Sequence, residues 1–265
     1  MSNNSITFVT SYYHIYENDK LFNNKTIEWR FNQFKDIAST GINICLYTDK
    51  ICYEYAEEFI KDYPNIVLMS SNTDDLTNTY AYKNIINDDN IEYTLPGNRH
   101  PIKDTTEYMI LINSKIEFVN KAIQQNPFHS THFAWIDFSI SYIFKNKENT
   151  LDYLKSLKQK TILSNDQLII PGCYTDKLNC DETHNILNNI YWRFCGGFFI
   201  GNSSSIIEFF NLYQTHFANF CKINKKIVWE VNFWAWLEAN TDWSPIWYYD
   251  THTDNIICIP DNYIS

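Results

Sequence analysis

Two polar side chains stand at the end of the apolar run that begins at His132. They are the carboxylate of Asp137 and, two positions later, the hydroxyl of Ser139. If residues 132–138 form a buried strand, both side chains leave its end on the same side, while Phe138 turns back into the core. Carboxylate and hydroxyl oxygens suit a hard cation. The run therefore predicts an oxygen-lined site, although a strand-end cap or a salt bridge is an alternative role for Asp137.

Glycine is scarce in this chain, yet three of its six glycines fall between Cys195 and Gly201. Such a concentration favours a tight turn or a close approach of the backbone to a partner. We interpret Gly196 and Gly197 as positions where an acceptor or a donor molecule approaches a strand. The alternative is that they make room for a bulky neighbour such as Trp192.

A carboxylate among indoles is the third candidate for chemistry. Glu230 lies in the segment Trp229-Glu-Val-Asn-Phe-Trp234, a combination that suits hydrogen bonding to a sugar and stacking against it. We place Glu230 and Trp229 on the acceptor side. In an inverting transfer, Glu230 is expected to be a general base whose pKa is raised by apolar surroundings. In a retaining transfer it is expected to orient the sugar, and the alternative is an ordinary exposed glutamate of a helix.

Five segments near the N-terminus predict how such groups are positioned. They are strands at 6–10, 42–47 and 66–69 and helices at 27–38 and 53–63. This β-α-β-α-β order is typical of a parallel sheet with right-handed crossovers. Because parallel strands end at the same edge of a sheet, residues 10–13, 48–49 and 137–139 are expected to lie close together.

The rest of the chain continues the alternation of helices and strands. Its strongest pattern is an amphipathic helix from Thr105 to Ile123, which Asp104 is expected to cap. Residues 72–104 show little periodicity and are expected to be irregular, with one short helix near Tyr82. The other expected elements are helices at 151–157, 203–221 and 229–237 and strands at 132–138, 168–170, 192–200 and 247–249. The predicted fold class is α/β, with a mainly parallel central sheet flanked by helices.

Composition restricts the function classes. The 265 residues can bury a substantial core and contain no segment typical of a linker, so a single domain is expected over residues 1–265. The net charge of -10 disfavours a nucleic acid as partner. A compact anionic ligand is compatible with that charge if cations are placed locally, and Arg99, Lys103 and Lys115 are the candidates.

Cysteines and apolar runs indicate the compartment. The seven cysteines form no CxxC pair, which favours free thiols over a zinc site or a disulfide framework. No apolar run approaches the roughly 20 residues that a membrane span requires, and the N-terminus lacks the features of a signal peptide. We expect a cytoplasmic protein, or one of a host cytoplasm if the source is viral. The sequence does not predict the oligomeric state.

Several common catalytic motifs are absent from the sequence. No GxGxxG follows the first strand and no GxxxxGK[ST] occurs, which counts against dinucleotide oxidoreductases and P-loop NTPases. No GxSxG elbow occurs either, which counts against an α/β-hydrolase.

Five segments of the chain carry a resemblance to a known family. They are Thr10-Ser-Tyr-Tyr13, Lys103-Asp-Thr-Thr-Glu-Tyr-Met109, Asn113-Ser-Lys115, Trp135-Ile-Asp-Phe138 and Cys195-Gly-Gly-Phe-Phe199. With these segments in this order, the chain resembles the HtrL/YibB group, related to the WlaTC proteins. That group is similar to glycosyltransferases of the GT-A type. The resemblance implies a GT-A-like, Rossmann-type domain whose residues 1–140 bind a nucleotide sugar and whose residues 141–265 bind the acceptor.

The resemblance also implies a metal site. Asp137 takes the place of the Asp-x-Asp motif that holds Mn²⁺ or Mg²⁺ against the donor diphosphate, where the cation stabilises the leaving group as a Lewis acid. Ser139 replaces the second carboxylate, which predicts weaker metal binding or none. His252 is expected as a late ligand, with Asp250 or Asp254 as alternatives to it.

Further donor-binding roles are assigned by position. Tyr12 or Tyr13 is expected to stack on a nucleobase and Thr10 to bond it, although packing alone is the alternative. Lys115 is expected to meet phosphate, with an exposed surface lysine as the alternative. The complete set assigned to the donor is Thr10, Tyr12, Tyr13, Arg99, Asp104, Lys115 and Ser139.

Three functions are compatible with these features. The first is metal-assisted transfer of a sugar from a nucleotide sugar, UDP-linked by the resemblance, to a glycan or protein-linked hydroxyl. The second is a catalytically weak or inactive protein that binds glycans or nucleotides on the same scaffold, which Ser139 favours. The third is another α/β enzyme, such as a nucleotidyltransferase, which normally needs two or more clustered carboxylates.

Overall fold

The computed structural model describes residues 5–16, 25–69, 76–86, 91–163 and 166–265. Its strands are β1 Ile6–Tyr12, β2 Asn43–Thr48, β3 Ile66–Leu68, β4 His132–Ile136, β5 Ile169–Gly172, β6 Phe198–Asn202 and β7 Ile246–Tyr249. Its α-helices are α1 Ile27–Ala38, α2 Lys50–Ile60, α3 Thr106–Asn113, α4 Lys115–Gln125, α5 Lys147–Ser156, α6 Ser203–Asn224 and α7 Glu230–Asn240. A π-helical turn at Tyr82–Ile86 occupies the place of the short helix expected near Tyr82.

In the described part of the chain, seven strands form one sheet in the order β3-β2-β1-β4-β6-β5-β7. β1 pairs in parallel with β2 and β4, and the pairs β2–β3 and β5–β7 are also parallel. β6 runs antiparallel to both of its neighbours, β4 and β5. The start of β6 therefore lies at the edge where β1, β4 and β7 end. The predicted α/β class with a mainly parallel sheet is confirmed.

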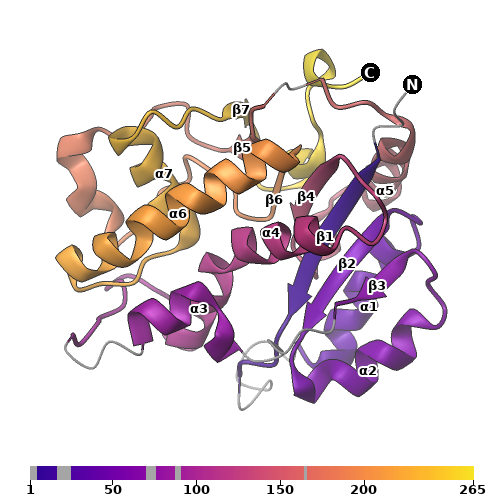
Figure 1. The fold of residues 1–265 in the computed structure, drawn as a ribbon, viewed down its shortest axis with the longest axis horizontal. Coiled ribbons are helices and arrows are strands. Elements are labelled where there is room, and N and C mark those ends of the chain that lie inside the picture. The colour runs from indigo at the N-terminus through magenta and orange to yellow at the C-terminus, as the bar shows by residue number, and fades with distance from the viewer. Residues whose placement is uncertain (1–4, 17–24, 70–75, 87–90, 164–165) are drawn as a thin grey trace.

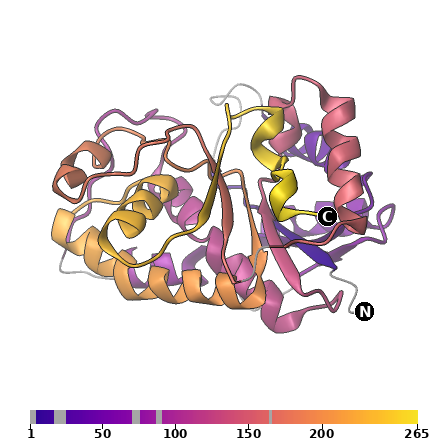
Figure 2. The same ribbon diagram turned by 90° about the horizontal axis from the view of Figure 1, so that it is seen from above.

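Alternating side chains of the strands supply two cores, one on each face of the sheet. On one face Phe8 and Ile136 pack with apolar residues of α1, α2 and α5. On the other face Val9 and Trp135 pack with α3, α4, α6 and α7. Figures 1 and 2 show α6 running along the second layer, opposite α1 and α2. Phe138 turns back into the first core, as the sequence predicts.

Two predicted elements are wrong in their extent. The helix expected from Thr105 to Ile123 is divided at Ser114, whose hydroxyl donates to the carbonyl of Ile110 at 2.8 Å. Thr105, not Asp104, caps α3, because its hydroxyl accepts the amide of Tyr108. The strand expected over 192–200 begins only at 198. The break at Ser114 directly precedes Lys115, and the late start of β6 leaves Gly196 and Gly197 outside the strand.

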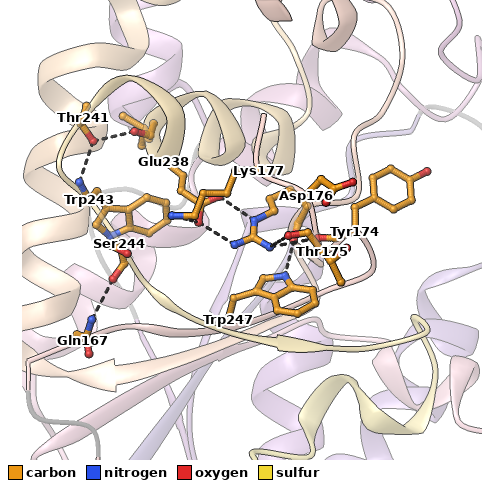
Figure 3. A network of polar contacts seen from close by, with 12 residues as sticks. Gln167, Tyr174, Thr175, Asp176, Lys177, Glu238, Thr241, Trp243, Ser244 and Trp247 are labelled. Carbon is orange, nitrogen blue, oxygen red and sulfur yellow. Dashed lines mark hydrogen bonds and ion pairs between the residues drawn. The ribbon is translucent and has the colours of Figure 1, made fainter. Parts of the chain in front are cut away.

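A buried ion pair joins α7 to the segment that leads into β6 (Figure 3). The Arg193 guanidinium donates to Glu238, with Nε 2.7 Å from Oε2 and Nη2 2.8 Å from Oε1. Nη1 of the same guanidinium donates to the carbonyls of Tyr174 and Thr175, at 3.2 and 3.0 Å. The carbonyl of Arg193 accepts the indole N–H of Trp247 at 2.7 Å. These bonds hold the segment before β6 against α7 and β7.

Asp254 holds the start of α5. Its Oδ1 accepts the amide of Asn146 at 2.9 Å and the hydroxyl of Thr150 at 2.7 Å, and its Oδ2 accepts the amide of Lys145 at 3.1 Å. Burial alone would raise the pKa of Asp254, but these hydrogen bonds outweigh it and lower the pKa. The carboxylate therefore stabilises the folded protein in its ionised form.

We expect Asp254→Asn to lower the free energy of unfolding by about 1 kcal/mol at neutral pH, as loss of a helix cap does. A lowered folded pKa gives stability that is present above the unfolded pKa of about 4 and lost as the pH falls through the folded pKa. Urea unfolding at pH 7 and pH 3 should show the difference from wild type narrowing at pH 3. The exposed Asp242→Asn is the control, and an equal difference at both pH values would contradict the assignment.

No helix among the described residues is both long and apolar enough to cross a membrane. The six cysteines whose side chains are described are free thiols. The Sγ atoms of Cys173 and Cys195 lie 3.5 Å apart beside the segment that leads into β6.

Candidate functional site

A cavity of about 300 Å³ opens at the carboxyl ends of β1 and β4. The chain leaves β1 for β2 and β3 on one side and returns to β4 on the other. This is the topological switch point of the sheet, where ligands of open α/β folds bind. The cavity is lined by residues that follow β1, β4 and β7 and by residues that precede β6. These residues lie at the same edge of the sheet, as expected from the sequence for residues 10–13 and 137–139.

One buried lysine bridges two carboxylates in the cavity wall. Nζ of Lys115 lies 2.9 Å from Oδ1 of Asp137 and 2.8 Å from Oε1 of Glu230. It also donates to the carbonyl of Gly196 at 2.8 Å. Oδ1 of Asp137 accepts a further hydrogen bond from the indole N–H of Trp135 at 2.7 Å. The two carboxylates predicted for catalysis therefore lie side by side, which the sequence alone does not show.

Local structure explains how these groups meet. The break at Ser114 makes Lys115 the first residue of α4, while Glu230 is the first residue of α7 and Asp137 directly follows β4. A Cβ at position 196 would lie 2.1 Å from Oε1 of Glu230. Gly196 therefore makes room for the Glu230 carboxylate, not for Trp192, and a larger residue would displace it.

The lysine is held in its charged form. Burial lowers the pKa of Lys115, but the negative charges of Asp137 and Glu230 and their hydrogen bonds outweigh burial and raise it. The side chain of Lys115 is only 7% exposed, which rules out the alternative of a surface lysine. The apolar surroundings expected for Glu230 are only part of its environment, because the ammonium of Lys115 neutralises charge beside it.

Aromatic residues form much of the remaining wall. Tyr12 and Tyr13 both line the cavity. The ring of Tyr12 is stacked on Phe138, with centroids 5.0 Å apart, whereas Tyr13 is buried against Phe118. Each tyrosine thus has a packing role as well as a place in the cavity. Trp229 also lines the cavity, and it is buried.

The predicted metal ligands are divided between two walls of the cavity. Asp137 and His252 both line it, but the amide of His252 donates to Asp250 and its ring packs edge-on to Trp192 at 4.9 Å. Among the described residues, no group of three or more His, Cys, Asp or Glu side chains is placed to hold a metal. Lys115 and Trp135 both bind Oδ1 of the Asp137 carboxylate, and metal binding by Asp137 and His252 stays a prediction.

Ser139 is the predicted replacement for a second carboxylate. It lines the cavity wall and is 6% exposed, and its buried hydroxyl has no hydrogen-bond partner among the described residues. A buried hydroxyl without a partner costs free energy. A bound ligand that reached this hydroxyl would remove that cost.

Three predicted donor-binding residues do not line the cavity. Thr10 is fully buried inside β1. The guanidinium of Arg99 is bonded to the carbonyl of Pro96 in its own turn. Asp104 accepts the amide of His100 and its Oδ1 lies 3.5 Å from Nζ of Lys103. Of the cations proposed from the sequence, Lys103 and Lys115 reach the cavity and Arg99 does not.

The cavity also contains residues that were not predicted from the sequence. Lys25 and Arg30 come from the start of α1 and the residues before it, and Tyr142 follows β4. One signal was present, because Arg30 lies three residues after Ile27 and four before Phe34, on the apolar stripe of its helix. A cation on an apolar stripe indicates a buried or ligand-facing position. Further added residues include Tyr16, Tyr108 and Trp192.

The sheet order, the cavity at the switch point and the lysine-bridged carboxylates define an α/β protein with a charged ligand site at the carboxyl edge of its sheet. The chain belongs to the HtrL_YibB family, since the model of that family, a bacterial protein of unknown function, matches residues 4–230. The resemblance to the HtrL/YibB group is thus confirmed. The relation to the WlaTC proteins and the GT-A type stay predictions. No curated protein matches the sequence.

Two solved structures are similar to this chain over most of its length. The 4-diphosphocytidyl-2C-methyl-D-erythritol synthase of Anaerococcus prevotii has 10% identity and a TM-score of 0.43, covering 98% of this chain and 93% of that chain. Mouse xyloside xylosyltransferase 1 in its apo form has 8% identity and a TM-score of 0.48, covering 93% and 85%. At such identities the similarity concerns the fold alone.

Proposed function

We propose that the protein is a glycosyltransferase that moves a sugar from a nucleotide diphosphate sugar to a hydroxyl of a glycan or protein-linked acceptor. The observation that carries the proposal is the pair of carboxylates, Asp137 and Glu230, that Lys115 joins in a cavity at the switch point. One carboxylate of such a pair can accept the proton of the acceptor hydroxyl, while the other can act on the charge that develops during the transfer. UDP is the expected nucleotide, by the family resemblance.

In the proposed reaction, the acceptor oxygen forms a bond to the anomeric carbon as the bond from that carbon to the donor phosphate breaks. The electron pair of the broken bond goes to the nucleoside diphosphate. In an inverting reaction Glu230 takes the acceptor proton, and in a retaining reaction it orients the sugar. The anomeric configuration of the product distinguishes the two. Residues 1–140 hold the donor and residues 141–265 the acceptor.

Asp137 and Lys115 have positioning roles in this proposal. Lys115 bonds one oxygen of each carboxylate and so fixes the position of both. Metal assistance by Mn²⁺ or Mg²⁺ stays a prediction. A cation carried in on the donor diphosphate needs few protein ligands, and Asp137 is the residue that would hold it.

A panel of nucleotide sugars, assayed with Mn²⁺ and with EDTA for release of nucleoside diphosphate, tests the proposal. We expect release of nucleoside diphosphate from one donor class, UDP sugars. We also expect UDP to bind in calorimetry, and to bind more weakly to Asp137→Ala if a metal joins Asp137 to the diphosphate. Binding of UDP without turnover of any donor would favour the second candidate, a nucleotide-binding protein. The hydroxyl of Ser139 at the place of a predicted second carboxylate is the feature that favours this candidate. No UDP binding at all would contradict both.

A further inference from the structure

The cavity is cationic in a protein of net charge -10. Among the described residues, four lysine and arginine side chains line it, against the two carboxylates of Asp137 and Glu230, and both carboxylates bind the same lysine. The other three basic residues, Lys25, Arg30 and Lys103, form a second group on the α1 side, here called the cationic cluster. An acidic protein that gathers basic side chains in one cavity favours an anionic ligand there.

Two contacts place Lys25 and Arg30 close together in the cavity that Lys103 also lines. Nζ of Lys25 lies 4.2 Å from the ring centroid of Tyr142 and 5.0 Å from that of Trp29, and the Arg30 guanidinium lies 5.6 Å from the same Trp29 ring. Burial lowers the pKa of Lys25, and the positive charges of Arg30 and Lys103 lower it further. The positive charges of Arg30 and Lys103 therefore act on Lys25, and an anion in this part of the cavity would be attracted by all three side chains.

One member of the cationic cluster, Lys103, is fixed by contacts of its own. Lys103 forms a 3.5 Å ion pair with the buried Asp104. The hydroxyl of Tyr16 donates to the carbonyl of Lys103 at 2.9 Å, which fixes the backbone that carries the ammonium. Lys103 is thus held in position by the fold, and Asp104 partly neutralises its charge.

Tyr142 connects the cluster to the carboxylate pair. Burial raises the pKa of Tyr142, the negative charge of Asp137 raises it further, and Arg30 lowers it. The tyrosine is therefore within the electric fields of both groups. An anion bound between Lys25 and Arg30 would lie next to the carboxylates that the proposed function assigns to catalysis.

We propose that Lys25, Arg30 and Lys103 form a diphosphate-binding subsite that takes the diphosphate of a nucleotide sugar and of the released nucleoside diphosphate. This inference rests on the proposed function for the identity of its ligand. A guanidinium and two ammonium groups donate charge-assisted hydrogen bonds to phosphate oxygens. They stabilise the charge that develops on the leaving group, so binding of the diphosphate does not require a divalent cation.

Calorimetry in EDTA with UDP, inorganic pyrophosphate and uridine tests the subsite. We expect UDP and pyrophosphate to bind the wild type and to lose about 10- to 100-fold in affinity in Arg30→Gln, the loss typical of a hydrogen bond to a charged group. Lys35→Gln is the matched control, because Lys35 is exposed on the same helix and does not line the cavity. Its affinities should stay within about twofold of wild type.

A second variant, Lys103→Gln, keeps the test valid if Arg30→Gln does not fold, which thermal unfolding would reveal. UDP affinities within about twofold of wild type in the folded variants, or pyrophosphate binding that requires Mn²⁺, would overturn the subsite. If the variants lose pyrophosphate binding as expected while no nucleotide sugar is cleaved, the subsite stands and the transferase function falls. If the wild type cleaves a donor and pyrophosphate binding is unaltered in the variants, the transferase function stands and the subsite falls.

Discussion

Glu230→Gln is expected to reduce sugar transfer about 10²- to 10⁴-fold while UDP affinity changes little, which is the usual effect of removing a general base. The substitution preserves the shape of the side chain and an oxygen that can accept from Lys115, so the 2.8 Å contact can persist. In the inverting form of the proposed reaction, it removes the group that receives the acceptor proton. The loss should therefore appear in kcat and not in donor binding.

Release of nucleoside diphosphate in the presence of acceptor measures this effect, with calorimetry of UDP as the binding readout. Glu208→Gln is the matched control, because Glu208 is an exposed glutamate of α6 that does not line the cavity. Turnover of Glu230→Gln within about fivefold of wild type would exclude Glu230 as the base, since a general base contributes far more. A parallel loss of UDP binding would instead assign Glu230 to the donor.

Most of the fold could be predicted from periodicity and apolar runs, because the helices bury a face against the sheet and the central strands are buried on both faces. The β-α-β-α-β order at the N-terminus and the strand that ends before Asp137 are examples. The break at Ser114 could not be predicted in this way. The apolar residues on either side keep helical spacing, so the pattern continues while the Ser114 hydroxyl and the Asn113 amide bond carbonyls and end the helix.

The candidate site could be predicted only where its residues lie at strand ends. Asp137 and Tyr12 follow from parallel-sheet geometry, since the ends of parallel strands share one edge. The pairing of Lys115 with Glu230 spans 115 positions, and it depends on how α4 and α7 are placed relative to each other. No local pattern encodes such a relation between helices.

The same limit explains the misplaced donor-binding residues. Arg99 and Lys103 are near neighbours in sequence, yet only Lys103 reaches the cavity, because the turn at residues 96–104 bonds to itself through Pro96, His100 and Asp104. Irregular segments have no periodicity that would show which face is inward. Side-chain direction in such a segment is set by its own hydrogen bonds.

Arg193→Met is expected to lower the free energy of unfolding by about 3–5 kcal/mol, the usual cost of breaking a buried ion pair by removing one partner. The side chains of Arg193 and Glu238 are 5% and 1% exposed. Without the guanidinium, the Glu238 carboxylate keeps only Lys177 among the described cations, at 3.2 Å and 56% exposed. The carbonyls of Tyr174 and Thr175 also lose their donor.

Lys177→Met is the matched control, because it removes a cation from the same carboxylate at an exposed position and should cost about 1 kcal/mol or less. Denaturant unfolding of Arg193→Met, Glu238→Leu and Arg193→Met/Glu238→Leu measures the coupling between the pair. We expect the double variant to recover part of the loss, since apolar groups then replace both buried charges. It should not recover all of it, because Tyr174 and Thr175 stay without their donor. A loss below about 1 kcal/mol in the free energy of unfolding of Arg193→Met would show that the ion pair does not hold α7 to the sheet. The position of Glu230 at the start of α7 would then need another explanation.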